Sequence, residues 1–320
     1  MILSGHMQLQ QTVKSASVGG RFRSGRQVES MAPDHDYWDA VGADWRTRRP
    51  QRLWREFTDR HQLGLIHRWL GTLASGGDDL GGVEASARLL KTDLFDEVSG
   101  RGLVRPLLAS GVRVTGIDIS PVIVAEAAAC NPGLDAVAAD VRSLPFADGS
   151  FTAIFSGSTL DHFGSTPEIR AALVELRRVL RPGGQLVLTM DNPANPLIGL
   201  RNGPLLAVLR RIGIVPYQVG ATLGPRALAA AVRDAGFEIV EATAVMHCPR
   251  ALAVPLAGLV DRLPEACRRG FMRCLAACER LESLPTRWLT GHYVAIHAVA
   301  REPEDGVTPT ARRSTSRSSS

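Results

Sequence analysis

Short apolar segments alternate with amphipathic segments through the middle of the chain, and this alternation limits the possible folds more than any other feature of the sequence. The apolar segments have the length and composition of buried parallel strands, at 89–95, 112–120, 134–139, 151–157 and 185–190. Between them lie segments with helical periodicity, at 102–110, 121–130 and 167–180. Such alternation predicts an α/β domain built on a doubly wound parallel sheet.

The parts outside this alternation divide the chain. At 320 residues with 45% hydrophobic content, the chain can bury a large core. Both ends lack periodic apolar positions, so we predict disordered segments at 1–30 and 302–320. Residues 31–75 carry four tryptophans among charged residues, which predicts an N-terminal helical cap with packed aromatic side chains. After a glycine-rich break at 76–82, the α/β domain is expected to occupy 83–301.

Two segments exceed what a minimal doubly wound domain requires. Residues 197–222 and 248–289 are apolar and bear arginines, which predicts helices that cover a substrate site. The segment at 289–300 is then expected to return as the last strand.

The charge and hydropathy of the chain exclude some classes of partner. The net charge of +5 is spread over dispersed arginines and partly over the two ends, so no basic stripe indicates a nucleic-acid surface. The apolar runs at 186–190 and 251–260 are too short to span a bilayer. We therefore expect a soluble monomer or homodimer that binds no nucleic acid and has no membrane span.

The cysteines indicate a reducing compartment. Their number, five, is odd, and the first residues contain no apolar stretch typical of an export signal, so we expect a cytoplasmic protein without disulfides. Cys267, Cys274 and Cys278 have the spacing of one helix face. A metal site would need a further ligand, which the neighbouring sequence does not provide, so we interpret them as small packed residues and predict no metal.

Acidic residues follow two of the predicted strands. Asp118 ends the second strand sixteen residues after Gly102, and Asp140 ends the third. In doubly wound sheets, ligands bind beyond the carboxyl ends of the strands, where the strand order reverses. A carboxylate at Asp118 can accept both hydroxyls of a ribose, and one at Asp140 can accept a hydrogen bond from an exocyclic amine.

These residues carry a resemblance to a known family. The stretch DEVSGRG at 96–102, followed by GRGLVRPLLASGVRVTGIDIS, DVRSLPFADGSFTAIFS and LRRVLRPGGQLVLT, resembles the successive motifs of class I S-adenosylmethionine-dependent methyltransferases, over about residues 85–300. The resemblance implies a seven-stranded Rossmann-like sheet, S-adenosyl-L-methionine as cofactor and transfer of its methyl group. The cofactor-binding residues that it implies are Asp96, Val98, Ser99, Gly100, Gly102, Asp118, Ile119, Asp140, Val141, Ser156 and Gly157.

The first motif departs from the family pattern, because Val98 stands where the first glycine is usual. A valine in the left-handed region would cost about 1 to 2 kcal/mol, so we predict that the loop takes another path and that Val98 has an ordinary negative φ. Gly100 and Gly102 remain for the close approach to the cofactor. Asp93 competes with Asp96 as the motif acid if the first strand ends early.

Three other functions were weighed against methyl transfer. A nucleotide-binding P-loop is excluded because no GK[ST] follows the glycines. A nicotinamide-dependent dehydrogenase would also use an acid after the second strand, but the chain lacks a GxGxxG turn. A non-catalytic partner protein of the same fold remains an alternative, since the first motif is altered.

Catalytic candidates follow the fourth and fifth strands. His162 and Asp161 stand at the rim of the expected site, where histidine can take a proton from an acceptor, although both could also be solvent-facing loop residues. Asn192, between Asp191 and Pro193, could bind a polar group of the acceptor or could merely end the strand. The expected acceptor is a moderately apolar or anionic small molecule, a class that includes lipid-linked and glycosylated compounds, and no residue selects oxygen, nitrogen or carbon as the methylated atom.

Overall fold

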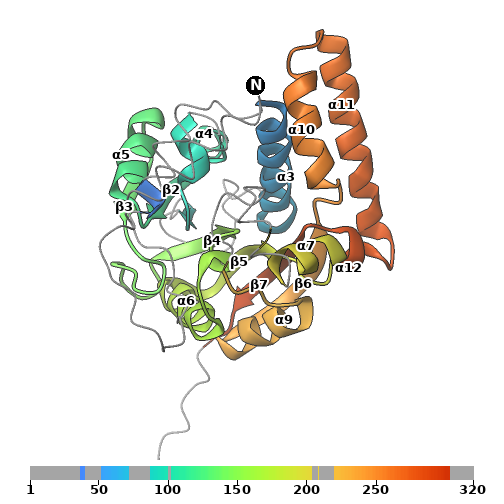
Figure 1. The fold of residues 1–320 in the computed structure, drawn as a ribbon. Helices are drawn as coiled ribbons and strands as arrows, with labels where there is room; N and C mark the ends of the chain where they lie inside the picture. The colour runs from blue at the N-terminus through green and yellow to red at the C-terminus, as the bar shows by residue number, and fades with distance from the viewer. Residues whose placement is uncertain are drawn as a thin grey trace, which may run out of the picture.

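A seven-stranded sheet forms the centre of the protein (Figure 1). The computed structural model describes residues 37–39, 52–71, 87–99, 102–203, 208 and 220–302. The sheet has the order β3-β2-β1-β4-β5-β7-β6. Its strands are β1 (Arg88–Lys91), β2 (Arg113–Asp118), β3 (Asp135–Ala138), β4 (Phe151–Gly157), β5 (Leu180–Asp191), β6 (Phe237–Val245) and β7 (Tyr293–Ala300).

The direction of the strands confirms the predicted α/β class. β1 pairs in parallel with both β2 and β4, so that Leu90 lies between Thr115 and Ile154, and β7 runs antiparallel to β5 and β6. The chain moves outward from β1 to β3 and then crosses back to β4 on the other side of β1. The strand order therefore reverses between β1 and β4, which is where this architecture leaves a crevice at the carboxyl ends.

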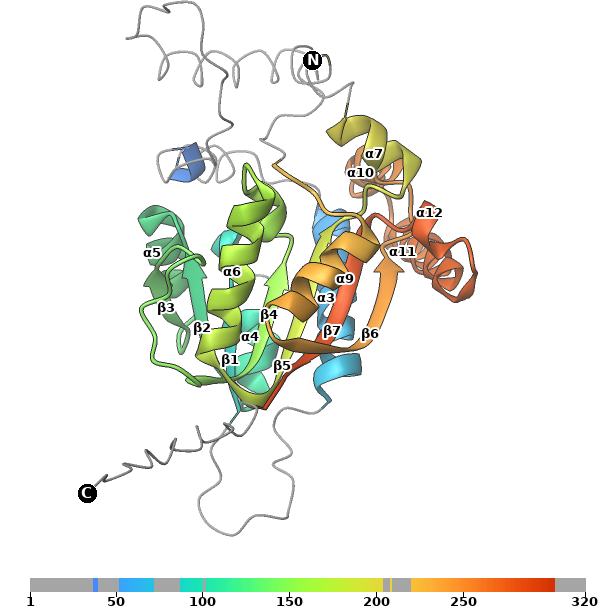
Figure 2. The ribbon, with the colours of Figure 1, turned by 90° about the horizontal axis from the view of Figure 1, so that it is seen from below.

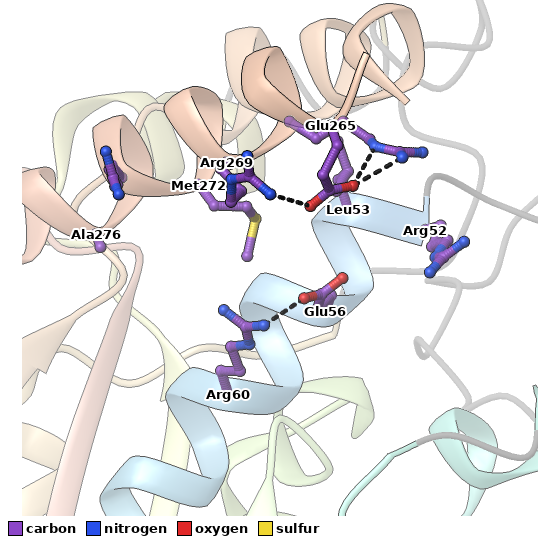
Figure 3. Close-up of a pocket in the computed structure, with 10 residues that line it drawn as sticks. Arg52, Leu53, Glu56, Arg60, Glu265, Arg269, Met272 and Ala276 are labelled. Atoms are coloured by element: carbon purple, nitrogen blue, oxygen red, sulfur yellow. Dashed lines mark hydrogen bonds and ion pairs between the residues drawn. The ribbon is translucent and has the colours of Figure 1, made fainter. Parts of the chain in front are cut away.

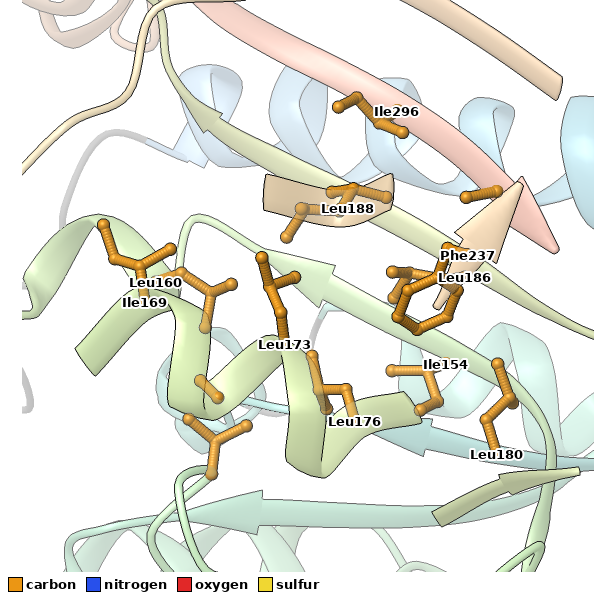
Figure 4. Packing of buried hydrophobic residues seen from close by; sticks show 14 of the residues in the cluster. Ile154, Leu160, Ile169, Leu173, Leu176, Leu180, Leu186, Leu188, Phe237 and Ile296 are labelled. Carbon is orange, nitrogen blue, oxygen red and sulfur yellow. The ribbon is translucent and has the colours of Figure 1, made fainter. Parts of the chain in front are cut away.

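One face of the sheet is covered by α6 (Thr166–Val179) and α9 (Pro225–Asp234). α6 places Ile169, Leu173 and Leu176 against the strands with no exposed surface, because these positions recur at helical spacing. Figure 4 shows these side chains meeting residues of β4, β5 and β7. This cluster is the main hydrophobic core.

The other face is covered by α3 (Arg52–Leu70), α4 (Val104–Ala109) and α5 (Pro121–Cys130). Ile66 and Trp69 of α3 pack on the sheet, and Trp54 packs in a second cluster with the C-terminal helices. The tryptophans at these two positions are therefore packing residues, as predicted. In Figure 2, α6 and α9 lie on one side of the sheet and α3 and α4 on the other.

Three details differ from the sequence predictions. The first strand ends at Lys91 rather than at residue 95, because the chain turns into a 3₁₀-helix, η1 (Phe95–Ser99). The turn predicted at 181–184 is a bulge inside β5, where Gly183 has a φ of +70°. The sequence did not locate β6, since its alternating exposed and buried residues follow directly on the end of α9.

The segment predicted to cover the site at 248–289 is helical. It consists of α10 (Arg250–Val260), α11 (Glu265–Cys278), η3 (Glu279–Ser283) and α12 (Arg287–Thr290). In Figure 1, α10 and α11 form a hairpin beside α3. Cys267 and Cys274 are exposed on α11, so the expectation that they pack against other residues was wrong.

Other predictions fall partly or wholly outside the described residues. The expected tails lie outside them, apart from residue 302, and so does most of the segment 197–222, where the structure describes α7 (Pro196–Asn202) and its immediate neighbours. No helix among those described is both long and apolar enough to cross a membrane.

Substitutions on α6 will test the core assignment. Leu173→Ala removes a side chain with no exposed surface, so we expect the free energy of unfolding to fall by about 2 to 5 kcal/mol. Val174, the next residue, is 58% exposed, so Val174→Ala should change the stability by less than about 1 kcal/mol. Denaturant melts of both variants give the comparison, and equal losses would contradict the assignment.

Candidate functional site

Four strands end at the same edge of the sheet, on both sides of the reversal in strand order. β1 ends at Lys91, β2 at Asp118, β4 at Gly157 and β5 at Asp191. This edge is at the top of Figure 2. Every predicted site residue that the structure describes lies in or directly after one of β1, β2, β3, β4 and β5.

A buried ammonium group binds the segment of the chain that follows β1. The Nζ atom of Lys91 donates to the backbone oxygen of Asp93 at 2.5 Å and lies 3.2 Å from its Oδ2 atom and 3.5 Å from Oε1 of Glu97. Burial alone would lower the pKa of Lys91, but the charges of Asp93, Glu97 and Asp96 outweigh it and raise that pKa. Lys91 is therefore a permanent cation under the loop.

Glu97 joins this loop to the next helix. Its carboxylate accepts hydrogen bonds from the backbone nitrogens of Leu103 (3.0 Å) and Val104 (3.3 Å), which begin α4. Gly102 has a φ of +85°, and a Cβ atom there would lie 2.5 Å from Oε2 of Glu97. Glycine is thus required at this position both by the backbone angle and by the carboxylate.

Val98, at the position of the usual first glycine, has no unusual backbone angle. Among the described non-glycine residues, positive φ angles occur only at Ser158 and Met246, so Val98 has an ordinary φ, as predicted for a rerouted loop. Its side chain packs beside Leu94 and Ile123. Ser99 is the last residue of η1, and Gly100 lies outside the described residues.

α3 holds the same loop from outside. The Arg55 guanidinium donates to the backbone oxygen of Asp96 at 2.7 Å and lies 3.2 Å from its Oδ1 atom. One turn further on, Asp59 accepts a hydrogen bond from the backbone nitrogen of Gly102 at 3.3 Å. Burial, together with the charge of Asp96, raises the pKa of Asp59 to about 6. Asp96 therefore anchors the loop to α3 in this structure.

Asp118 is buried at the end of β2. One carboxylate oxygen accepts from the backbone nitrogen of Leu94 at 3.1 Å and the other from that of Ser120 at 2.9 Å. A carboxylate can accept about four hydrogen bonds, so each oxygen retains one acceptor position. Burial raises the pKa of Asp118 to about 6, although the two backbone donors act in the opposite direction.

The other residues predicted after β2 and β3 lie close to Asp118 in the chain or on the neighbouring strand. Ile119 is half-buried, whereas Val141 is part of the main core. Asp140 is half-buried and receives hydrogen bonds on both oxygens from Arg142, at 3.0 Å from Nε. Burial would raise the pKa of Asp140, but the hydrogen bonds from Arg142 prevail and lower it. Asp140 therefore stays ionised.

Hydroxyl groups join β4 to the residue that follows β1. The Ser156 hydroxyl is fully buried and accepts a hydrogen bond from Thr92 at 2.9 Å, while Thr92 also contacts the Thr159 hydroxyl at 2.8 Å. Gly157 is the last residue of β4, and a Cβ atom there would lie 2.9 Å from the Phe155 ring. Ser156 thus supports the site from beneath.

His162 and Asp161 differ in their surroundings. Both belong to η2 (Leu160–His162), but Asp161 is buried, whereas the His162 side chain is 31% exposed. Oδ2 of Asp161 accepts from the Ser158 hydroxyl at 3.0 Å and from the backbone nitrogen of Asp191 at 3.1 Å. Oδ1 has no hydrogen-bond partner in the described part of the chain and lies 3.9 Å from Nε2 of His162. Asp161 is thus no solvent-facing loop residue.

Of the two roles that the sequence left open for Asn192, the hydrogen bonds of its side chain support the structural one. Its amide nitrogen donates to the backbone oxygens of Trp288 (2.8 Å) and Gly291 (3.0 Å), and its oxygen accepts from the backbone nitrogen of Ala194. The side chain is fully buried, so it fastens the end of β5 to the chain before β7. This is the structural role that the sequence left open as the alternative.

Asp191 is the polar centre of the same region. It pairs with Arg201 of α7 and accepts from Asn202 at 3.2 Å, and its Oδ1 atom lies 3.6 Å from Nε2 of His292. Burial, together with the neighbouring charge of Asp161, raises the pKa of Asp191. Burial and the nearby arginines lower the pKa of His292 well below its usual value, so this histidine is neutral.

A helical turn at 37–39 contacts two of these strand ends. Asp39 accepts a hydrogen bond from the hydroxyl of Ser120, after β2. Trp38 lies edge-on to the His162 ring, with centroids 4.8 Å apart. The turn therefore spans the carboxyl edge between Asp118 and His162.

Sequence reasoning missed four residues that shape this site: Lys91, Glu97, Arg55 and Asp59. Lys91 could have been noticed as a charge at the end of an apolar strand and as one of two lysines in the whole chain. Arg55 and Asp59 share a helix face at a spacing of four, which is common on solvated helices and therefore gave no signal.

Comparison with known proteins places this geometry in a family. Residues 97–188 match a family model described as a methyltransferase domain. A demethylmenaquinone methyltransferase from Thermus thermophilus is 31% identical over 211 residues, which cover 58% of this chain and 92% of that protein. The chain belongs to the class I S-adenosylmethionine-dependent methyltransferases.

Other matches are shorter or more distant. A demethylmenaquinone methyltransferase from Beutenbergia cavernae is 42% identical over 96 residues, 30% of this chain and 39% of that protein. The chain spans 39% to 53% of the length of three curated relatives. A methyltransferase solved in complex with the Haloferax volcanii Trm112 activator is 17% identical with a TM-score of 0.49, covering 86% of this chain and 100% of that one.

The buried charges after β1 give a stability prediction. Glu97→Leu leaves Lys91 with an incomplete set of counter-charges and removes the cap of α4, so we expect the free energy of unfolding to fall by about 3 to 5 kcal/mol. The double variant Lys91→Met/Glu97→Leu should lose less than the single variant, because no uncompensated buried charge remains.

The control is Glu56→Leu, which removes the partner of Arg60 in an exposed ion pair of α3. Such pairs contribute about 0 to 1 kcal/mol, so a small change is expected in the same denaturant melt. A Glu97→Leu variant as stable as this control would refute the role assigned to Glu97.

Proposed function

We propose that this chain transfers a methyl group from S-adenosyl-L-methionine to a small acceptor molecule with a large apolar part. The observation that carries the proposal is Asp118, a buried carboxylate with spare acceptor positions beside the loop after β1, at the reversal of strand order, in a chain of this family. Ribose hydroxyls are donors that such a carboxylate binds.

The residues around Asp118 fit the cofactor. Ile119 offers a half-buried apolar side chain next to the ribose position, and Asp140 a half-buried ionised carboxylate after the neighbouring strand. Gly102, with a φ of +85°, lets the loop turn into α4 beside this site. We propose that Val98, Ser99, Val141, Ser156 and Gly157 also belong to this cofactor site, and that Asp96 anchors its loop.

When bound, the cofactor supplies a methyl group on a positively charged sulfur atom. An acceptor that received this group would have to give up a proton. His162 is placed to take this proton, since it is partly exposed at the same edge. The buried Oδ1 atom of Asp161, 3.9 Å away, stabilises the positive ring, and Trp38 restricts its orientation.

The acceptor class is inferred from exposed apolar residues beside the edge. Leu197 and Leu200 of α7 are 62% and 47% exposed, and Leu252 and Leu256 of α10 are 63% and 47% exposed. α7 and the adjoining end of α10 lie beside each other in Figures 1 and 2. Exposed apolar side chains on these two helices favour contact with an apolar ligand. Two relatives are named demethylmenaquinone methyltransferases, so demethylmenaquinone is the first acceptor to test.

Cofactor binding can be tested at Asp118. Asp118→Asn removes the charged acceptor of the ribose hydroxyls, so the dissociation constant of S-adenosyl-L-methionine should rise about 10- to 100-fold in calorimetry. NADH should not bind the unaltered protein. Asp148→Asn, which alters an exposed carboxylate, should leave the affinity unchanged, and an equally unchanged Asp118→Asn variant would remove Asp118 from the site.

The pKa of Asp118 predicts that the affinity for S-adenosyl-L-methionine depends on pH. Its raised pKa of about 6 means that the free protein protonates Asp118 as the pH falls through 6, whereas the hydroxyl donors need the ionised form. The affinity for S-adenosyl-L-methionine should be constant above pH 7 and weaken about tenfold per pH unit well below 6. Asp118→Asn should flatten this profile, and an unaltered profile in that variant would assign the titration to another group.

The variant His162→Ala tests whether His162 is the general base. With demethylmenaquinone in detergent micelles, the formation of S-adenosylhomocysteine should slow about 10²- to 10⁴-fold, because general base catalysis is lost. The affinity for S-adenosyl-L-methionine should stay within about twofold. His67→Ala, on the exposed surface of α3, is the matched control. An unchanged rate would leave proton removal to a group other than His162.

A further inference from the structure

A groove lined by five arginines lies between α3 and α11. Its volume is about 480 Å³. Figure 3 shows Glu56 and Arg60 on α3 facing Glu265 and Arg269 on α11 across the space between the two helices. The arginines are Arg52, Arg60, Arg268, Arg269 and Arg273.

The acidic residues of the groove neutralise only part of this charge. Arg60 pairs with Glu56 at 2.5 Å, and Arg268 pairs with Glu265 at 2.7 Å, while Arg269 lies 3.7 Å from the same carboxylate. Arg52 and Arg273 form no hydrogen bond or ion pair within the part of the chain that the structure describes. Five guanidinium groups thus share two carboxylates.

The floor of the groove is apolar. Leu53 is buried, and Met272 packs against the cluster that joins α3 to the C-terminal helices. The volume lies within the range of about 300 to 1,000 Å³ that is typical of small-molecule sites. The groove can therefore hold an anion of several heavy atoms, with its charged groups on the arginines and an apolar portion on the floor.

We propose that this groove binds a ligand that carries phosphate groups. Guanidinium groups bind phosphate oxygens through paired hydrogen bonds, and they remain charged at every physiological pH. Each ion pair within the groove has at least one side chain that is more than half exposed, and such pairs contribute little energy, so a phosphate can bind their arginines at small cost. The phosphate can belong to a free soluble compound or to a lipid headgroup, and both use the same contacts.

The first arm of the test uses a soluble probe. Inorganic pyrophosphate should bind the full chain in calorimetry, with an affinity that falls as salt is added. The double variant Arg52→Ser/Arg273→Ser should raise its dissociation constant at least about tenfold, because two charge-assisted contacts are lost. The control, Arg226→Ser/Arg233→Ser, makes the same change of charge on exposed residues of α9, at the other end of the molecule in Figure 1.

The second arm uses lipid vesicles. Sedimentation with phosphatidylcholine vesicles, with and without phosphatidylglycerol, measures binding to a lipid phosphate. Binding that needs phosphatidylglycerol and is lost in the groove variant, but not in the α9 variant, assigns the site to lipid headgroups. Binding of pyrophosphate alone with the same dependence assigns it to a soluble ligand.

Two outcomes would overturn the proposal. One is that neither probe binds the unaltered protein, and the other is that the groove and α9 variants lose binding equally, which would show a general effect of charge. Thermal melts establish that both variants are folded, and both should bind S-adenosyl-L-methionine as the unaltered protein does. A protein that fails to bind S-adenosyl-L-methionine could still bind pyrophosphate in the groove. The proposal for the groove and the proposal for the cofactor site can therefore be refuted independently.

Discussion

The buried ammonium group of Lys91 is the interaction on which the cofactor edge depends. A cation without exposed surface needs nearby negative groups, and the chain supplies them by turning sharply after β1, so that Asp93 and Glu97 reach Nζ. This turn produces η1 and sends Glu97 to the start of α4. The usual glycine-rich cradle is therefore replaced by a loop whose path is fixed by charge pairing. An ordinary valine fits this path, because the loop no longer needs positive φ at residue 98.

A second polar network fixes the opposite side of the edge. Asn192 joins the end of β5 to the backbone before β7, and Asp191 binds α7 through Arg201. Asp161 accepts a hydrogen bond from the backbone of Asp191, which joins the end of β5 to the segment after β4. His162, the partly exposed neighbour of Asp161, lies beside this network, which would define its position in the role that we propose for it.

The fold was predictable because its signals are repeated along the chain, whereas much of the site was not. Five parallel strands and the helices on both faces follow from periodicity, and Asp118 and Gly102 follow from spacing to the strand ends. The sequence did not predict β6, because Val240 is exposed and charged residues interrupt the apolar pattern of this strand. The role of Asn192 stayed open because a sequence cannot show that backbone oxygens almost a hundred residues later accept hydrogen bonds from its amide. Lys91, Glu97, Arg55 and Asp59 act through contacts between separate elements, which no local pattern records.

α3 links the two regions for which we have proposed ligands. Arg55 and Asp59 hold the loop after β1, while Arg52, Glu56 and Arg60 form the neighbouring row of the same helix and face α11. The helix is anchored between them by Leu53, Trp54 and Phe57, which pack with α10 and α11 in one cluster. One row of α3 therefore holds the cofactor loop through Arg55 and Asp59, while the adjacent row lines the groove, so both proposed sites depend on the position of this one helix.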